Sequence, residues 1–229
     1  MSQRRWEVLG GISGALFAVL LLVGIVPGGM PPVYGTDSKG VVDYFTGHQG
    51  GLEATFFFGN VLPTVLGTLF SAVLFLAIWR AERSARWGAT VGLVGAATIG
   101  AFAAAISIVW SILVYDAGQL GTTSSLASVL YDGTVEADAA SIFIEGLVAL
   151  GFGMALARLA GSWRGIGIAG AGVGILNFIV GVVMFGATFK TGGLPLLGIG
   201  TFVIWTVVVG LVLAARGVPE ATVAAERGA

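Results

Sequence analysis

Six long apolar segments, each about the length of a membrane-spanning helix, constrain this chain more than any other feature of its sequence. A helix needs about 20 mostly apolar residues to cross the roughly 30 Å hydrocarbon core of a bilayer. Of the 229 residues, 56% are hydrophobic and only 10% are charged, more apolar surface than a soluble fold could bury. The expected spans are 9–27, 52–79, 87–115, 138–160, 163–189 and 194–215. We therefore predict an all-α polytopic membrane protein, with one bundle of six transmembrane helices over 1–216 and a short cytoplasmic tail over 217–229.

The first span is interpreted as a membrane helix rather than as a secretory signal. Its apolar run from Leu9 to Val26 is longer than the apolar region of a signal peptide, which has about 7–15 residues. No cleavage site formed by small residues follows the run.

The charged residues of the short loops predict the orientation. Nine arginines fall on one side of the spans and two lysines on the other. Short cytoplasmic loops carry the excess of basic residues, so both termini are expected in the cytoplasm. The opposite side is acidic, with Asp37, Asp43, Glu53, Asp116, Asp132, Glu136 and Asp138. Arginine in place of lysine, with abundant Ala, Gly and Val, is typical of a high-GC bacterium, so we expect a multi-pass protein of the bacterial plasma (inner) membrane.

Two outer loops are long enough to hold short helices. In the first, Pro31 and Pro32 break the chain, and Asp37 or Ser38 caps a helix that ends near His48. In the second, between 118 and 133, a cap within 122–125 precedes apolar residues spaced for one helical face. Together these two helices are expected to cover the outer end of the bundle.

Several classes of function are disfavoured by what the sequence lacks. The chain has no cysteine and only one histidine, His48, which excludes cysteine-based and multi-histidine metal sites. With 11 basic and 12 acidic residues it has no concentrated basic charge for nucleic acid. No nucleotide loop or nucleophile–base pair is visible, so no cofactor is predicted and a non-enzymatic function is favoured over an enzymatic one.

Small residues mark the faces on which membrane helices pack. The third span carries such a stripe at four-residue spacing, with Gly88, Gly92, Ala96, Gly100 and Ala104. Packing is the favoured interpretation, and the alternative is a face that docks a membrane-protein partner or a second copy of the chain, through Gly88, Gly92 and Gly100.

Polar residues on three other stripes form the candidate site. Glu145 lies on a small-residue face of the fourth span, Asn177 on one of the fifth, and Glu53 and Asn60 on one of the second. At ~1.5 Å per residue, Glu145 lies about 10 Å below the outer surface, Asn60 about 12 Å and Asn177 about 15–18 Å. An ionisable group at such depth is a functional hypothesis by default. Pro63 is expected to kink the helix beside Asn60, as a packing feature rather than as a gate.

Two functions remain open. One is the binding or transport of a small molecule or cation at an outward-facing site formed by Glu145, Asn60, Asn177 and Glu53. The other is a non-catalytic structural or accessory subunit of a membrane complex, in which Glu145 is protonated and hydrogen-bonded between helices.

Two short matches resemble the serine and histidine motifs of rhomboid intramembrane proteases. They are GGISGALF from Gly10 and GHQGGLEA from Gly47. The predicted topology places Ser13 near the cytoplasmic end of the first span and His48 beyond the opposite surface. A general base must lie within about 3 Å of its nucleophile, so the topology argues against this chemistry.

The overall plan is similar to that of small bacterial six-helix membrane proteins of unknown function. The motifs that carry this resemblance are VVDYFTGHQ at the end of the first outer loop, the arginine-marked turn after the second span, and the turn at Trp163, Arg164 and Gly165 before a glycine-rich fifth span. It extends over nearly the full length and implies a fold but no activity.

Overall fold

The computed structural model describes residues 2–24, 26–121, 125–186 and 194–219, and the regular elements in these ranges are helices. Six of them are long and apolar enough to cross a membrane: Gln3–Gly28, Gln49–Ala81, Arg83–Leu120, Leu126–Leu156, Ser162–Met184 and Leu194–Arg216. The predicted all-α, multi-pass plan with six candidate spans is therefore confirmed. The end of the fifth predicted span and the tail from 220 onward lie outside the described residues.

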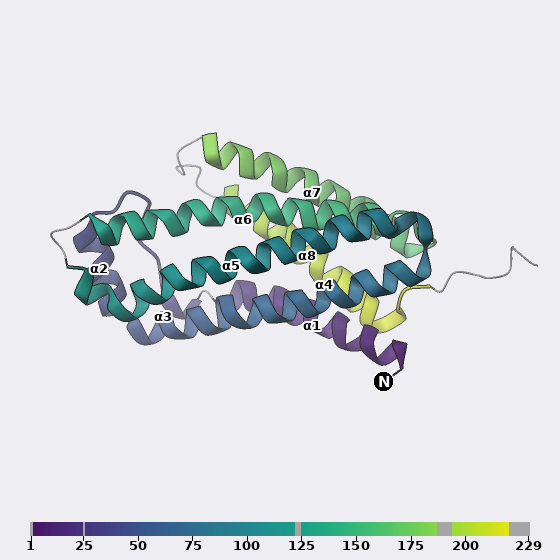
Figure 1. Cartoon of the computed structure of the whole chain (residues 1–229), viewed down its shortest axis with the longest axis horizontal. Coiled ribbons are helices and arrows are strands. Elements are labelled where there is room, and N and C mark those ends of the chain that lie inside the picture. The colour runs from purple at the N-terminus through teal and green to yellow at the C-terminus, as the bar shows by residue number, and fades with distance from the viewer. Residues whose placement is uncertain (1, 25, 122–124, 187–193, 220–229) are drawn as a thin grey trace, which may run out of the picture.

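The elements follow one another along the chain as long helices joined by short connections (Figure 1). They are α1 (Gln3–Val23), the 3₁₀ turn η1 (Val26–Gly28), α2 (Ser38–Gly47), α3 (Gln49–Thr55), the π-helical turn η2 (Phe56–Val61), α4 (Leu62–Ala81), the 3₁₀ turn η3 (Arg83–Ala85), α5 (Arg86–Leu120), α6 (Leu126–Leu156), α7 (Ser162–Gly186) and α8 (Leu194–Arg216). Helix α6 packs between α5 and α7, and α1 packs against α4 and α8.

The first predicted short helix corresponds to α2, at one end of the bundle (Figure 1). Asp37 is its N-cap, because the Asp37 carboxylate accepts a hydrogen bond of 2.8 Å from the Gly40 N–H. The buried residues Val41, Val42 and Phe45 form its inner face.

The second predicted short helix is not a separate element. Its residues form the first turns of α6, which begins at Leu126 instead of near 138 and continues without a break to Leu156. Part of the predicted cap, residues 122–124, lies outside the described residues, and the Ser125 side chain makes no capping hydrogen bond. The acidic segment that looked like a loop is therefore helical.

Close approach of backbones holds α5 to α6. A Cβ atom added to Gly151 would lie 2.3 Å from the Gly92 nitrogen, and one added to Gly88 would lie 2.9 Å from the Gly151 carbonyl oxygen. Separations this short leave no room for a side chain. Gly88 and Gly92 are thus used for packing within the chain and do not form a face open to a partner, whereas a Cβ at Gly100 would meet only the Thr68 hydroxyl, at 3.8 Å.

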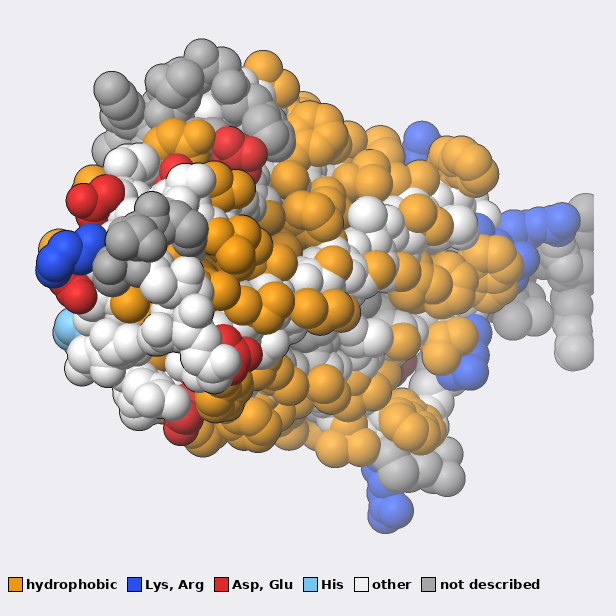
Figure 2. Space-filling model, turned by 60° about the vertical axis from the view of Figure 1, so that its left-hand side comes forward, with side chains coloured by type: hydrophobic (Ala, Val, Ile, Leu, Met, Phe, Trp, Pro, Cys, Tyr) orange, Lys and Arg blue, Asp and Glu red, His pale blue; other side chains and the backbone are white. Residues whose placement is uncertain are grey.

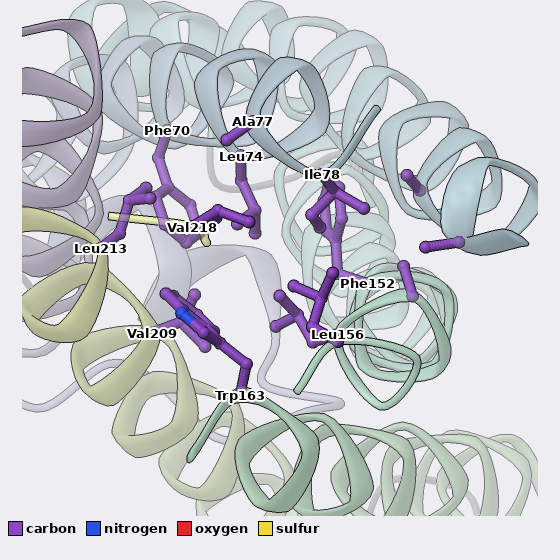
Figure 3. Close-up of a cluster of buried hydrophobic side chains, with 14 of the residues drawn as sticks. Phe70, Leu74, Ala77, Ile78, Phe152, Leu156, Trp163, Val209, Leu213 and Val218 are labelled. Carbon is purple, nitrogen blue, oxygen red and sulfur yellow. The ribbon is translucent and has the colours of Figure 1, made fainter. Parts of the chain in front are cut away.

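A cluster of large apolar side chains fills one half of the bundle (Figure 3). Leu74 and Ile78 of α4, Leu156 of α6 and Leu213 of α8 are among its most buried members. Trp163, at the start of α7, is 3% exposed and its indole N–H donates to the Gly217 carbonyl at 3.0 Å. Gly217 and Val218 of the predicted tail are therefore packed against the bundle.

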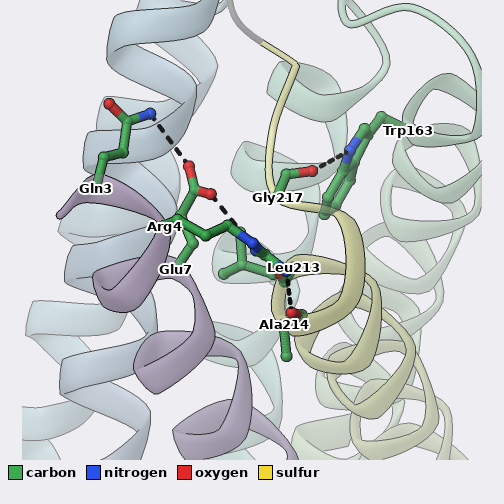
Figure 4. Close-up of polar contacts among 7 residues, drawn as sticks. All are labelled: Gln3, Arg4, Glu7, Trp163, Leu213, Ala214 and Gly217. Atoms are coloured by element: carbon green, nitrogen blue, oxygen red, sulfur yellow. Dashed lines mark hydrogen bonds and ion pairs between the residues drawn. The ribbon is translucent and has the colours of Figure 1, made fainter.

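Charge is segregated along the long axis of the molecule. In Figure 2 most of the acidic side chains gather at one end, most of the basic side chains lie at the other, and an apolar band separates them. Glu7 and Glu82 are exceptions that lie beside arginines. The start of α1 and the end of α8 meet at the arginine end, where Arg4 donates to the carbonyl oxygens of Leu213, at 2.9 Å, and Ala214 (Figure 4). The end of the molecule that holds most of the arginines is called the arginine end, and the opposite end is called the acidic end.

Candidate functional site

A cavity of about 340 Å³ lies among α1, the α3–α4 span, α5, α6 and α8. Pockets that bind small molecules in proteins have volumes of about 300–1,000 Å³ and are mostly apolar, with a few polar groups that fix the ligand. The wall here fits that description, because aliphatic and aromatic side chains surround two carboxylates, one amide and several hydroxyls. The cavity is therefore large enough for a small ligand.

The cavity occupies the half of the bundle nearer the acidic end. Its lining ends at Ser71 on α4, at Val148 on α6 and at Thr206 on α8. On each of these helices the packed apolar cluster of Figure 3 continues from about that point toward the arginine end. The cluster thus closes the cavity on the arginine side.

Helix α6 places both carboxylates on one wall. Ser141 and Ile142 each lie three or four residues from both Asp138 and Glu145, a spacing that puts all four on one helical face, and all four line the cavity. Glu145 is 6% exposed, and its Oε2 atom is buried without a hydrogen-bond partner among the described residues. Asp138, two turns closer to the acidic end, is exposed. No basic side chain is among the lining residues that the structure describes.

The turn η2 and helix α4 form the wall that carries the amide and three of the six lining hydroxyls. The polar lining residues there are Asn60, Thr64, Thr68 and Ser71. The Thr64 hydroxyl donates to the Asn60 carbonyl at 2.8 Å, and the Ser107 hydroxyl of α5 lies 3.4 Å from the Asn60 amide oxygen. The Asn60 amide nitrogen makes no hydrogen bond within the described part of the chain, so it is left as a donor for the cavity.

Asn60 lies in the π-helical turn η2, and the cause of this turn is local. Pro63 has no N–H to donate to the carbonyl of Gly59 and its ring crowds that turn. The helix responds with the π-helical turn η2, in which the Leu62 N–H donates to the Phe57 carbonyl instead. The expected irregularity beside Asn60 is therefore a π-helical turn, a feature often found at functional sites.

The structure brings together two of the four predicted site residues. Glu145 and Asn60 line the same cavity, whereas Asn177 and Glu53 are not among its lining residues. Asn177 is fully buried and faces α8, since a Cβ added to Gly198 would lie 2.8 Å from its amide oxygen. Glu53 is exposed on α3, 3.5 Å from the Gln49 amide nitrogen.

In the alternative interpretation Glu145 is a hydrogen-bonded clasp between helices, but its Oε2 atom has no partner among the described residues. The Asn60 and Asn177 side chains make hydrogen bonds with Ser107 and Val173, respectively, and neither bonds to Glu145. The amide oxygen of Asn177 is itself buried without a partner among the described residues.

Sequence reasoning missed Asp138 as a site residue, because it was assigned to the acidic outer surface. The signal that could have identified it is its seven-residue separation from Glu145, which puts two residues on the same face of a helix. The aromatic residues Phe202 and Trp205 also form part of the cavity wall.

Helix α2 packs against the cavity wall at the acidic end. The ring of Phe45 lies 5.6 Å from that of Trp110, which lines the cavity, and 6.1 Å from that of Tyr131. The Tyr131 hydroxyl donates to the Pro32 carbonyl at 2.6 Å. The loop before α2 also binds α6 through the Tyr34 hydroxyl, which donates to Glu136 at 3.1 Å, and this hydrogen bond raises the pKa of Tyr34.

The residues of the rhomboid-like matches lie apart. The Ser13 hydroxyl, at the middle of α1, donates to the Leu9 carbonyl at 2.8 Å. His48 lies at the junction of α2 and α3, at the acidic end, and its Nδ1 atom is 2.9 Å from the Tyr44 carbonyl oxygen. Among the described residues no group of three or more His, Cys, Asp or Glu is placed to hold a metal ion.

Comparison of the chain with family models, with curated proteins and with solved structures found no match in any of the three.

Proposed function

We propose that this protein binds or transports a small molecule or a cation in the cavity around Glu145. The observation that supports this most directly is that Glu145 lines a cavity of about 340 Å³ while its buried Oε2 atom has no hydrogen-bond partner among the described residues. Leaving a buried polar group unpaired costs about 1–3 kcal/mol, and more when the group is charged. A ligand that pairs with the carboxylate would recover this free energy.

The proposal includes an orientation in the membrane. Nine arginines and two lysines, together with the positive-inside bias, favour the arginine end in the cytoplasm of a bacterium and the acidic end outside the plasma membrane. Since the apolar cluster closes the cavity toward the arginine end, the site then faces outward.

Cysteine accessibility tests both parts of this proposal, and the absence of native cysteine makes the test clean. A membrane-impermeant thiol reagent is applied to intact cells that carry Glu145→Cys, Asp138→Cys, Asp43→Cys or Ser84→Cys, each in a separate chain. We expect labelling at 43, 138 and 145, fastest at the exposed positions 43 and 138, and protection at 84. Labelling at 43 together with protection at 145 would argue against an aqueous path to the site, and labelling at 84 but not at 43 would invert the orientation.

A structural or accessory role in a membrane complex is the second candidate, and the exposed surface of α5 favours it. Only 11% of the most apolar 18-residue stretch of the Arg83–Leu120 span is buried within the protein. The small residues Ala101 and Ala104 and the neighbouring Ile108 are exposed there, and small residues permit close approach of a partner helix. Loss of a co-purifying partner on Ala104→Leu, with no effect of Glu145→Gln, would favour this role.

A further inference from the structure

The two carboxylates of the cavity are unpaired within the described part of the chain. Neither Asp138 nor Glu145 accepts a hydrogen bond within the part of the chain that the structure describes, and the described ion pairs involve other residues. The lining residues include no Lys, Arg or His. An anion would be repelled here and a neutral acceptor would leave the carboxylates unpaired, whereas a cation pairs with a desolvated carboxylate more strongly than a neutral donor does, so the site favours a ligand that brings positive charge.

A divalent metal ion does not fit this arrangement. Seven residues of helix separate the two carboxylates by about 10 Å along the axis, too far for one ion to bind both. Calcium takes 6–8 oxygen ligands and magnesium six. The described residues offer no cluster of three or more acidic, histidine or cysteine side chains for such an ion.

The rest of the wall suits the apolar part of an organic molecule. Aromatic rings come from five elements around the carboxylates: Phe17, Phe56, Phe70, Trp110, Phe202 and Trp205. Organic cations bind to the faces of such rings with about 0.5–2 kcal/mol each. Trp110 and Trp205 are the most favourable of the six, since tryptophan is the best of the aromatic partners.

The edge of the cavity is apolar as well. Leu22 at the end of α1 and Leu196 at the start of α8 both line the cavity, and they are 45% and 70% exposed. The cavity therefore reaches the surface of the protein beside side chains that lipid or an apolar solute contacts readily, while the exposed Asp138 lies on the same wall as Glu145.

We propose that the cavity binds an organic cation with an apolar body, such as a lipophilic amine or a quaternary ammonium compound. The charged nitrogen pairs with Glu145, the apolar body contacts the aromatic wall, and Asp138, nearer the acidic end, makes the first charged contact. This inference rests on the proposed function and specifies its ligand class.

Equilibrium binding of radiolabelled benzyltrimethylammonium to the full chain in lipid nanodiscs tests the inference. We expect saturable binding to the native protein, weakened about tenfold or more by Glu145→Gln, because that change removes the ion pair in a desolvated site. Glu145→Asp keeps the charge and should retain part of the affinity. Glu53→Gln is the matched control, because this exposed glutamate lies outside the cavity, and it should bind as the native chain does.

Three results would overturn the inference. They are equal affinity of the native and Glu145→Gln chains, binding of the uncharged isostere neopentylbenzene as tightly as the cation, and no saturable binding of the cation to the native chain. If Glu145→Gln does not fold, Asp138→Asn and the comparison of cation with isostere on the native chain decide the question. Labelling at Glu145→Cys separates the two proposals: labelling without cation binding refutes the ligand class alone, whereas a protected position 145 refutes the outward-facing site.

Discussion

Asp138 and Glu145 lie two turns apart on one face of α6 and line the same cavity, one exposed and the other 94% buried. A helix that carries two unpaired carboxylates toward a cavity inside a membrane protein is less stable than one with apolar residues at these positions. Such an arrangement is typical of sites at which stability has been sacrificed for function.

The first prediction follows from this cost. Glu145→Met replaces the unpaired carboxyl group with an apolar side chain of similar length, so we expect the free energy of unfolding to rise by about 1–3 kcal/mol. Thermal unfolding of the purified protein in nanodiscs measures this as a higher melting temperature. Glu53→Met, at an exposed position outside the cavity, is the control and should give no comparable gain. A lower melting temperature for Glu145→Met would show that the carboxylate is stabilising, as in the clasp interpretation.

The second prediction concerns the contact between α5 and α6. Gly151→Ala places a methyl group 2.3 Å from the Gly92 nitrogen, and backbone atoms cannot yield as a flexible side chain can. The helices must separate, at a cost of about 1–3 kcal/mol or more.

Gly172→Ala on α7 is the matched control, because nothing lies within 4 Å of its added Cβ atom. Melting temperature and the monodispersity of the purified protein distinguish the two variants. Equal stability of both would mean that α5 and α6 are not in backbone contact at Gly151.

The extent of the membrane spans could be predicted because a helix that crosses lipid must be apolar, and hydropathy detects apolar segments. It could not locate the start of α6, since hydropathy marks where the apolar layer ends and not where the helix ends. Asp132 and Glu136 are helical because they find partners at the acidic end, in the Gly35 N–H and the Tyr34 hydroxyl. Those partners lie about a hundred residues away in the sequence, and no local pattern reveals them.

The candidate site was predicted in part for a similar reason. Polar residues on small-residue faces pointed to Glu145 and Asn60, and both line the cavity. Glu53 was assigned to the stripe of Asn60 on the assumption of a regular α-helix. The π-helical turn between them changes the helical phase, so Glu53 is rotated away from that face. Asn177 lies on α7, which packs against α6 at Gly146 and contributes no residue to the cavity wall.

The third prediction tests the attachment of the chain segment that precedes α2. Tyr131→Phe removes the hydrogen bond to the Pro32 carbonyl and keeps the ring contact with Phe45. Because Tyr131 is 4% exposed, we expect a loss of about 1 kcal/mol in the free energy of unfolding and faster amide hydrogen exchange in α2. Tyr115→Phe is the control, since Tyr115 is 53% exposed. Unchanged exchange in α2 would show that this hydrogen bond does not hold the segment.

The fourth prediction concerns the arginine end, where α1 and α8 meet (Figure 4). Arg4 donates to two carbonyl oxygens at the end of α8 and lies 3.7 Å from the carboxylate of Glu7, which is 5% exposed. Arg4→Ala leaves those carbonyl oxygens and a buried carboxylate without their cation. Since the Arg4 side chain is itself 44% exposed and partly screened by water, we expect a moderate loss of about 1–2 kcal/mol in the free energy of unfolding.

A second substitution identifies which of these contacts matters. In Arg4→Ala with Glu7→Gln the buried group is no longer charged, so about half of the lost stability should return if the unpaired carboxylate is the main cost. No recovery would assign the effect of Arg4 to its hydrogen bonds with Leu213 and Ala214. Arg5→Ala, which removes a neighbouring exposed arginine, controls for the change in net charge, and thermal unfolding of the four chains in nanodiscs gives the comparison.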